Sequence, residues 1–188
     1  MRTRREMMSK IVVVYESKYG STKKYAQWLA KELEADLFDR SKMNGEKLEE
    51  YDIIIFGGGL YASGIAGVSL IKKNYQRLKD KVIVVFTVGL ASTDNKEVFV
   101  PIIDKNFKKE IQDNIHFFHL RGGIDYQNIG MIHNMMMRML RSTLVKKSED
   151  QLTQDDKELL ATFGKKVDYT HKETLEPMIT FINNKKME

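Results

Sequence analysis

The chain has 188 residues, of which 42% are hydrophobic and 30% are charged, and its formal net charge is +5. This composition is typical of a globular protein that folds as one domain around a sizeable core. The absence of cysteine excludes disulfides, thiolate metal sites, iron–sulfur clusters and cysteine nucleophiles. No apolar run approaches the length of a membrane span or of a signal-peptide core, and we therefore expect a cytoplasmic protein.

The two ends of the chain differ from its middle. Residues 1–9 are polar and basic, and we expect a disordered N-terminal tail there. One domain is expected to cover residues 10–170, followed by a C-terminal extension at 171–188. The positive charge leaves an anionic ligand or an anionic membrane surface open. We expect no nucleic-acid partner, because the chain has no recognisable binding motif and no long basic run interleaved with aromatics.

The first predicted strand is the apolar, β-branched run Ile11–Val14, which is typical of a buried parallel strand. A loop follows, and apolar residues at helical spacing then predict a crossover helix over about 22–34. Residues 36–39 predict a short strand near a sheet edge. The later predicted elements are a strand at 51–56, a helix at 68–78, a strand at 81–87, a helix at 96–109 containing or broken by Pro101, a strand at 116–120, and helices at 131–145 and 154–166. The packing of residues 175–182 stays unassigned.

Strands that alternate with helices predict an α/β fold with a parallel sheet, right-handed crossovers and helices on both faces. Five strands with a short second strand fit a doubly wound sheet of order 2-1-3-4-5. In such a sheet the ligand lies beyond the carboxyl ends of the strands, at the switch between strands 1 and 3. We expect three loops to meet there, at 17–22, 57–64 and 88–94.

The first loop, Ser17-Lys18-Tyr19-Gly20-Ser21-Thr22, places three hydroxyls around a glycine at the start of a predicted helix. Backbone N–H groups and the helix N-terminus can converge on an anion there. The loop matches neither G-x-x-x-x-G-K-[ST] nor G-x-G-x-x-G, so a P-loop and a dinucleotide fingerprint are not indicated. A phosphomonoester suits these hydroxyls, while a plain turn capped by Ser or Thr is the alternative.

Glycines mark the other two loops. Gly57-Gly58-Gly59 would let the backbone approach a flat ligand closely and adopt positive φ. Tyr61 follows on what we expect to be a mobile glycine loop, either as a surface tyrosine or as a ring that stacks on a flat cofactor. Gly89 in the third loop again permits close backbone approach.

These segments together resemble a known family. Tyr15–Thr22 resembles the FMN phosphate loop of the flavodoxin family, roughly S/T-x-x-G-x-T, which Ser17, Gly20 and Thr22 match. The resemblance narrows to the flavodoxin-like, menaquinone-dependent protoporphyrinogen dehydrogenases and their uncharacterised relatives, on the segments 51–57, 122–126 and 156–163. It covers about residues 10–167 and implies a flavodoxin-like, three-layer α/β/α fold with FMN as cofactor.

The resemblance also implies a set of FMN-binding residues. The phosphate would be bound by Ser17, Lys18, Tyr19, Gly20, Ser21 and Thr22, one side of the flavin by Gly58, Gly59, Leu60 and Tyr61, and the other side by Val88, Gly89, Leu90 and Ala91. The flavin would perform the redox chemistry, while the protein positions and tunes it. No catalytic side chain is identified and no metal is expected. The third loop lacks the aromatic of many carrier flavodoxins, which leaves one flavin face open to a substrate.

Functions from different classes remain open. The first is an FMN-dependent oxidoreductase linked to a quinone or to protoporphyrinogen, whose partner is a redox protein or a small electron donor or acceptor. The second is a flavodoxin-type electron carrier without its own substrate, and the third is a flavin-free interaction domain. Carrier flavodoxins are acidic as a family, so the net charge of +5 favours the enzyme. The segment 125–130 is less basic than in the dehydrogenases, which argues against protoporphyrinogen.

A stripe of methionines marks the predicted helix at 131–145. It favours packing in the core, and its members recur at helical spacing: Met131, Ile132, Met135, Met136, Met139 and Leu140. The alternative is a basic amphipathic helix, Met131–Val145, that touches lipid, a quinone or a tetrapyrrole, and so brings the protein to the inner face of the membrane.

Histidines give little indication of a metal site. Only His116 and His119 lie close in sequence, and residues three apart in a strand point to opposite faces. We expect these two, together with His133 and His171, to be structural.

Overall fold

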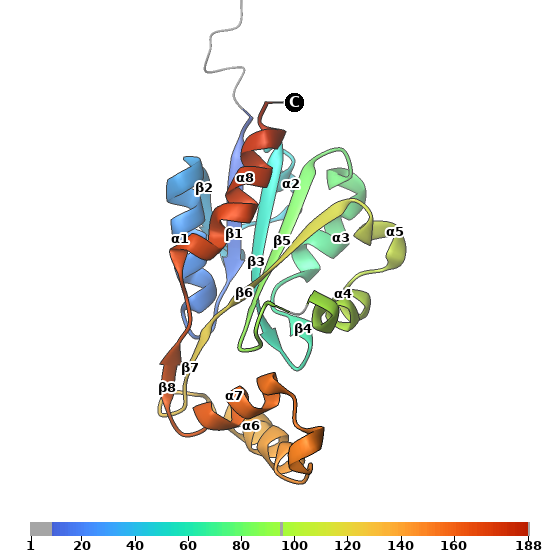
Figure 1. Cartoon of the computed structure of the whole chain (residues 1–188). Coiled ribbons are helices and arrows are strands. Elements are labelled where there is room, and N and C mark those ends of the chain that lie inside the picture. Colours follow the sequence, from blue (N-terminus) through green and yellow to red (C-terminus); the bar gives the residue numbers. More distant parts are fainter. Residues whose placement is uncertain (1–8, 95, 188) are drawn as a thin grey trace, which may run out of the picture.

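The computed structural model describes residues 9–94 and 96–187 of the chain. The tail predicted at residues 1–9 lies, apart from Ser9, outside the described residues. Five parallel strands form the central sheet in the order β2-β1-β3-β5-β6 (Figure 1). Their bounds are β1 Ile11–Glu16, β2 Asp36–Asp39, β3 Ile53–Tyr61, β5 Val82–Gly89 and β6 Ile115–Arg121. Because β4, Gly64–Ile65, only extends β3 as an antiparallel hairpin, this is the predicted order with Asp36–Asp39 at an edge.

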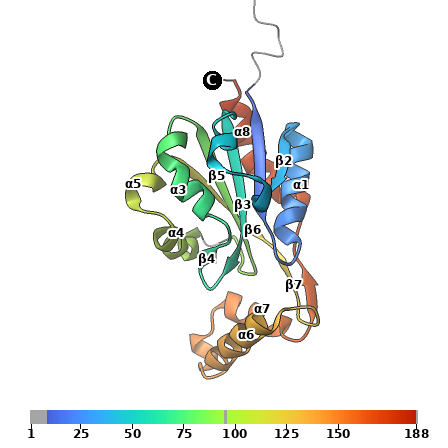
Figure 2. The same cartoon turned by 180° about the vertical axis from the view of Figure 1, so that it is seen from behind.

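Helices cover both faces of the sheet, as Figures 1 and 2 show from opposite sides. One face carries α1 (Ser21–Leu33) and α8 (Glu176–Lys185); the other carries α2 (Gly45–Leu48), α3 (Ser69–Leu78), α4 (Val100–Asn106) and α5 (Lys109–Gln112). Short 3-10 turns lie at Arg40–Lys42, Lys96–Phe99, Glu149–Gln151 and Lys172–Leu175. The uninterrupted apolar run of β1 follows from this layering, since Val13 packs under α1 and Val12 packs on the opposite side.

A second unit lies beyond the carboxyl ends of the parallel strands (Figures 1 and 2). An antiparallel ribbon of β7 (Gly123–Asp125) and β8 (Lys166–Asp168) carries α6 (Met131–Leu144) and α7 (Gln154–Thr162). The Arg121 guanidinium donates to the Glu158 carboxylate at 2.6 Å and to the carbonyl oxygen of Leu90 at 3.1 Å. One side chain at the end of β6 therefore fixes α7 to the sheet.

Some predicted boundaries are wrong for physical reasons. The glycines at 57–59 and the residues Val88 and Gly89 belong to strands rather than loops. The helix predicted at 96–109 is divided, because Pro101 lies in the first turn of α4, where a missing N–H is tolerated. The helix predicted at 154–166 ends at Thr162, and Gly164, in the left-handed region with φ 78°, turns the chain into β8.

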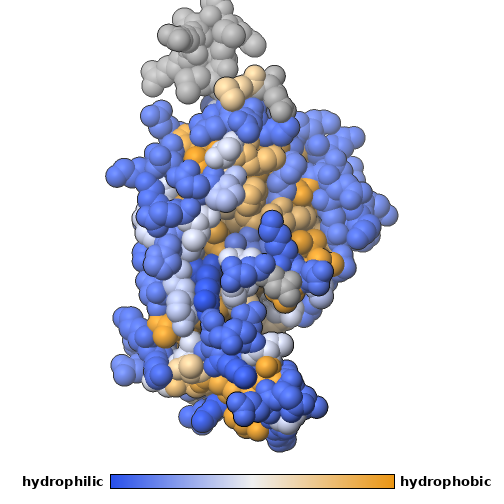
Figure 3. All heavy atoms as spheres, viewed as in Figure 1, coloured by the Kyte–Doolittle hydropathy of each residue, from blue (hydrophilic) through white to orange (hydrophobic). Residues whose placement is uncertain are grey.

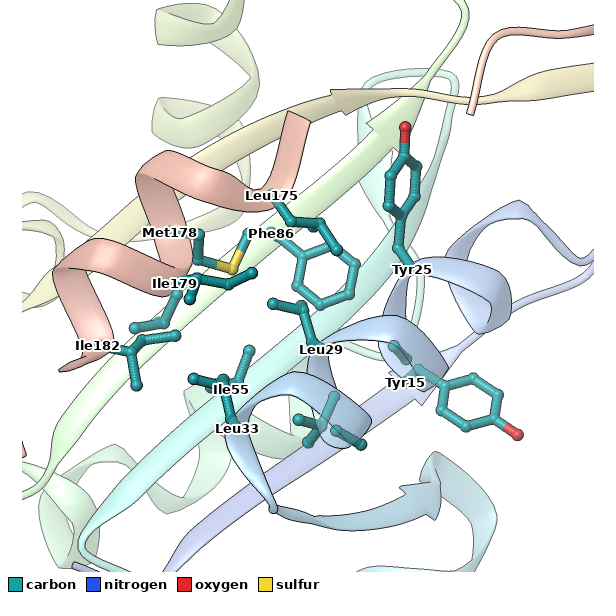
Figure 4. Close-up of a cluster of buried hydrophobic side chains, with 14 of the residues drawn as sticks. Tyr15, Tyr25, Leu29, Leu33, Ile55, Phe86, Leu175, Met178, Ile179 and Ile182 are labelled. Atoms are coloured by element: carbon teal, nitrogen blue, oxygen red, sulfur yellow. The ribbon is translucent and has the colours of Figure 1, made fainter. Parts of the chain in front are cut away.

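The segment at 175–182 forms a helix that completes one face of the core. Its apolar side chains Leu175, Met178, Ile179 and Ile182 are buried, and Figure 4 shows them beside Leu29, Ile55 and Phe86. Full burial of such side chains contributes about 1.5–3 kcal/mol each. Pro177 is accommodated because it lies in the first turn of α8.

Candidate functional site

A cavity of about 140 Å³ lies between the carboxyl edge of the sheet and α6. Ten of the fourteen predicted cofactor residues line it: Ser17, Tyr19, Ser21, Thr22, Gly59, Leu60, Tyr61, Val88, Gly89 and Leu90. Lys18, Gly20, Gly58 and Ala91 do not. The structure thus brings the three predicted segments to one place at the switch between β1 and β3, as expected for a doubly wound sheet.

The loop after β1 is shaped by Gly20, which takes φ 96° directly before α1. The first intrahelical bond is donated by Lys24 N to the carbonyl oxygen of Gly20. The N–H groups of Ser21 and Thr22 precede it, and such groups are the ones that bind anions at helix N-termini. Hydroxyls also brace the loop, because Ser17 Oγ accepts from Gly20 N and Ser21 Oγ accepts from Gly123 N, each at 3.1 Å.

The three glycines at 57–59 serve close packing and not positive φ, which was the wrong part of their prediction. A Cβ on Gly57 would clash with the ring of Phe86, and one on Gly58 would lie 2.6 Å from the carbonyl oxygen of Ala66. A Cβ on Gly59 would lie 2.9 Å from the Tyr61 hydroxyl. Because Gly59 has no Cβ, the Tyr61 ring has room to lie back over the strand at the cavity.

In the turn between β3 and β4, the residues with left-handed backbone conformation are Ala62 (φ 48°) and Ser63 (φ 64°). Asn106 of α4 clamps this hairpin: its amide donates to the Ser63 carbonyl at 2.7 Å, and its Oδ1 accepts from Ile65 N at 3.1 Å. Tyr61 therefore ends a clamped strand, and its placement on a mobile loop was wrong.

Aromatic contacts close the cavity on the α6 side. The rings of Tyr61 and His133 are stacked, with centroids 4.7 Å apart, and Tyr19 meets each of them edge-on. The Tyr19 hydroxyl is 2.6 Å from His133 Nδ1 and accepts from Gly130 N at 3.2 Å. Burial raises the pKa of Tyr61, and burial with the nearby Lys18 charge lowers the pKa of His133. The start of α6 is thus attached to two predicted cofactor segments.

A family model for the flavodoxin domain matches residues 12–152. The chain belongs to the flavodoxin domain family. Among curated relatives, an uncharacterized protein of Methanocaldococcus jannaschii is 28% identical over 113 residues, which are 56% of this chain and 65% of that protein. The matched region therefore spans slightly less than two thirds of the relative.

Solved structures similar to this flavodoxin-domain protein include a WrbA-like flavodoxin from Agrobacterium tumefaciens, with 27% identity over 52% of this chain and 73% of that one and a TM-score of 0.40. The Trp repressor binding protein of Bacillus subtilis has 18% identity over 60% of this chain and 83% of that one, with a TM-score of 0.44. Oxidised flavodoxin 1 of Bacillus cereus has 18% identity over 60% and 84%, with a TM-score of 0.39.

The second unit of this flavodoxin-domain protein supplies cavity residues that the sequence analysis missed. His133, Met136 and Met137 line the cavity from α6, Ile124 lines it from β7, and Ile129 lines it from the connection before α6. Ala62, Gly122 and Gly123 complete the missed set. A signal for the α6 residues was present, since positions 133, 136 and 137 share one helix face.

The remainder of the methionine stripe is exposed, so its prediction as core packing was wrong for Met131, Ile132, Met135, Met139 and Leu140. α6 has apolar residues on its cavity side and also on its outer side. Among the described residues, no helix combines the length and apolarity needed to cross a membrane.

The strand histidines lie on opposite faces of β6, as predicted. His116 packs on Phe181 of α8, whereas His119 stacks on Phe99 with ring centroids 3.8 Å apart. The Thr87 hydroxyl is 2.7 Å from His119 Nδ1, and burial lowers the pKa of His119 to about 4. Within residues 9–94 and 96–187, no cluster of His, Asp and Glu could hold a metal ion.

Proposed function

We propose that this flavodoxin-domain protein binds FMN in the cavity and transfers electrons through it as an oxidoreductase. The observation that supports this best is the convergence of three segments: the α1 N-terminus with its hydroxyls, the end of β3 with Tyr61, and the end of β5 with Leu90. The α1 N-terminus matches a phosphate, and Tyr61, Leu90 and the glycine-containing strand ends match a flat ring.

The residues fit the chemistry of FMN. Ser17, Ser21 and Thr22 with the α1 N–H groups would hold the phosphate without a buried counter-charge. Leu60, Tyr61 and Leu90 would hold the ring, and a Cβ on Gly89 would already press on Leu60 at 3.1 Å. The bound flavin would supply the electron transfer, and the chain would position it and exclude water.

The cavity is smaller than a typical ligand site, which sets a condition for FMN binding. Sites for small-molecule ligands usually measure about 300–1,000 Å³, and the cavity measures about 140 Å³. Access for FMN therefore requires the contact between α6 and Tyr61 to open.

The cover formed by α6 favours an enzyme over a pure electron carrier. A carrier needs one flavin edge close to the surface, whereas His133, Met136 and Met137 enclose a mostly apolar space. A flat, apolar electron donor or acceptor suits this space, and a quinone or a tetrapyrrole such as protoporphyrinogen are the candidates to test. We propose that the activity takes place in the cytoplasm, at the inner face of the membrane.

The first experiment titrates purified protein with FMN and follows flavin fluorescence and absorbance. We expect quenching with a stoichiometry of one FMN per chain. A protein that leaves flavin fluorescence unchanged, at concentrations that saturate known flavodoxins, would contradict the proposal.

The second experiment separates the enzyme from the carrier. The FMN-loaded protein is reduced anaerobically and mixed with a menaquinone analogue, or the oxidised form is mixed with protoporphyrinogen. Saturable oxidation or reduction of the flavin by one of these compounds supports the enzyme. Reaction with a purified redox protein alone supports the carrier.

A further inference from the structure

The outer face of α6 is an exposed apolar ridge. Met131, Ile132, Met135 and Met139 are 88%, 69%, 67% and 70% exposed, and successive members follow helical spacing. Single exposed apolar residues are ordinary, but a contiguous group of this kind marks an interaction site. Figure 3 shows hydrophobic residues gathered at the α6–α7 end of the molecule.

The charged side chains of α6 itself, and of the residues that directly follow it, are all positive. No Asp or Glu occurs between Asp125 and Glu149, and Arg138, Arg141 and Lys146 are exposed. Arg141 lies over the Phe163 ring at 5.9 Å, which keeps its charge at the surface. An apolar ridge bordered by cations is the pattern of a helix that lies in the interface of an anionic bilayer.

We propose that the outer face of α6 docks this protein on the surface of an anionic lipid bilayer. A second copy is a poorer occupant, because a two-fold symmetric contact on this face would bring the same three cations against each other. The ridge is convex, and the flexible methionines can adapt to a fluid surface without a complementary pocket.

Docking would place the cavity next to the bilayer. α6 turns His133, Met136 and Met137 toward the cavity and the ridge away from it, so one helix, about 10 Å in diameter, separates the two. An apolar reactant dissolved in the bilayer could then reach the cavity around this helix. The docking itself does not depend on FMN, so its test stands apart from the test of the proposed function.

The experiment measures flotation of the full chain with vesicles of phosphatidylcholine alone or mixed equally with phosphatidylglycerol. We expect binding to the mixed vesicles, weakened by salt because surface charges are screened. Absence of binding to the mixed vesicles, or equal binding to neutral vesicles, would overturn the proposal.

A matched pair of variants locates the contact. Met135→Gln/Met139→Gln keeps good helix formers on an exposed face, and we expect at least about a tenfold loss of binding. Met187→Gln is the control, since Met187 is 79% exposed and follows α8, whose C-terminal end lies at the opposite end of the molecule from α6 (Figure 1). Circular dichroism confirms that each variant is folded. Equal binding by both variants would overturn the assignment to α6.

A charge variant and a mass measurement complete the test. Arg138→Gln should weaken binding about fivefold, the effect of one cation near an anionic surface, while Lys72→Gln on α3 should not. Light scattering on a sizing column should show a mass that Met135→Gln/Met139→Gln leaves unchanged. A dimer that this variant dissociates would show that a second copy occupies the ridge, and would overturn the proposal.

Discussion

The imidazole of His133 lies parallel to the phenol ring of Tyr61, with centroids 4.7 Å apart and an angle of 13° between the planes. Tyr61 ends a strand of the central sheet, and His133 belongs to helix α6 of the second unit. This stack, with the hydrogen bond between the Tyr19 hydroxyl and His133 Nδ1, attaches α6 directly to residues that line the cavity. We therefore expect it to limit access to the proposed FMN site.

Replacing His133 by Ala should make FMN associate faster. A stacked ring pair contributes about 0.5–1.5 kcal/mol and a hydrogen bond about 1 kcal/mol, so the open form should become about 10- to 70-fold more populated. Stopped-flow quenching of FMN fluorescence measures the association rate. The control is His171→Ala, because His171 is exposed and does not line the cavity. An unchanged rate in His133→Ala would show that the stack does not limit access.

Thr22→Ala should weaken FMN binding by about 1–2 kcal/mol, the scale of a lost hydrogen bond to a charged group. Thr22 is buried in the first turn of α1 and lines the cavity. Equilibrium titration with FMN gives the affinity. Thr143→Ala removes a hydroxyl bonded to the Met139 carbonyl within α6 and should leave the affinity unchanged. An unchanged affinity in Thr22→Ala would remove Thr22 from the site.

The β1–loop–α1 segment could be predicted because its signals are local. The apolar run at 11–14, Gly20 and the apolar spacing of the helix each constrain a few neighbouring residues. The sheet order followed, since parallel strands with helical crossovers allow few topologies. A signal for α8 was also local, since residues 175, 178, 179 and 182 have helical spacing and Pro177 is compatible with a first turn, but the segment was left unassigned.

What could not be predicted depends on contacts between distant segments. The methionine stripe has the same periodicity whether it is buried or exposed, and only the position of α6 at the edge of the molecule decides this. The cavity role of His133 requires its contact with Tyr61, which no local pattern encodes. The close contacts that the glycines at 57–59 permit are with Phe86, Ala66 and Tyr61, and the approach of a flat ligand stays a prediction.

Asn106→Ala should destabilise the fold by about 2–4 kcal/mol. The buried Asn106 amide makes three hydrogen bonds, to Ile65 N and to the carbonyl oxygens of Ser63 and Ile102, and its loss leaves these buried groups without their partner. Urea unfolding measures the change. Asn114→Ala, which removes only a 3.5 Å bond at the surface, should stay within about 0.5 kcal/mol. A cost below about 1 kcal/mol for Asn106→Ala would contradict the clamp.

His119 should make the fold less stable as the pH falls from about 6.5 to 4. Burial lowers its pKa to about 4 in the folded protein, whereas the unfolded chain titrates near pH 6.5. Between these values the unfolded state binds more protons, so stability is fully present above pH 6.5 and is lost as the pH falls. The loss should reach about 2–3 kcal/mol, because one pKa unit corresponds to about 1.4 kcal/mol and the ring is only partly buried.

The measurement is urea unfolding at a series of pH values, in parallel for the wild type and His119→Gln. Glutamine can keep a hydrogen bond to the Thr87 hydroxyl but does not titrate, so the variant should show a smaller slope between pH 6.5 and 4. Some slope should remain, because the pKa values of His116 and His133 are also lowered. Burial would raise the pKa of Asp168, but hydrogen bonds from Thr170 and Lys24 outweigh that effect and lower the pKa to about 2. Protonation of Asp168 therefore destabilises the fold only below this pH range. An equal slope in His119→Gln and the wild type would show that the buried imidazole is not the group whose protonation destabilises the fold.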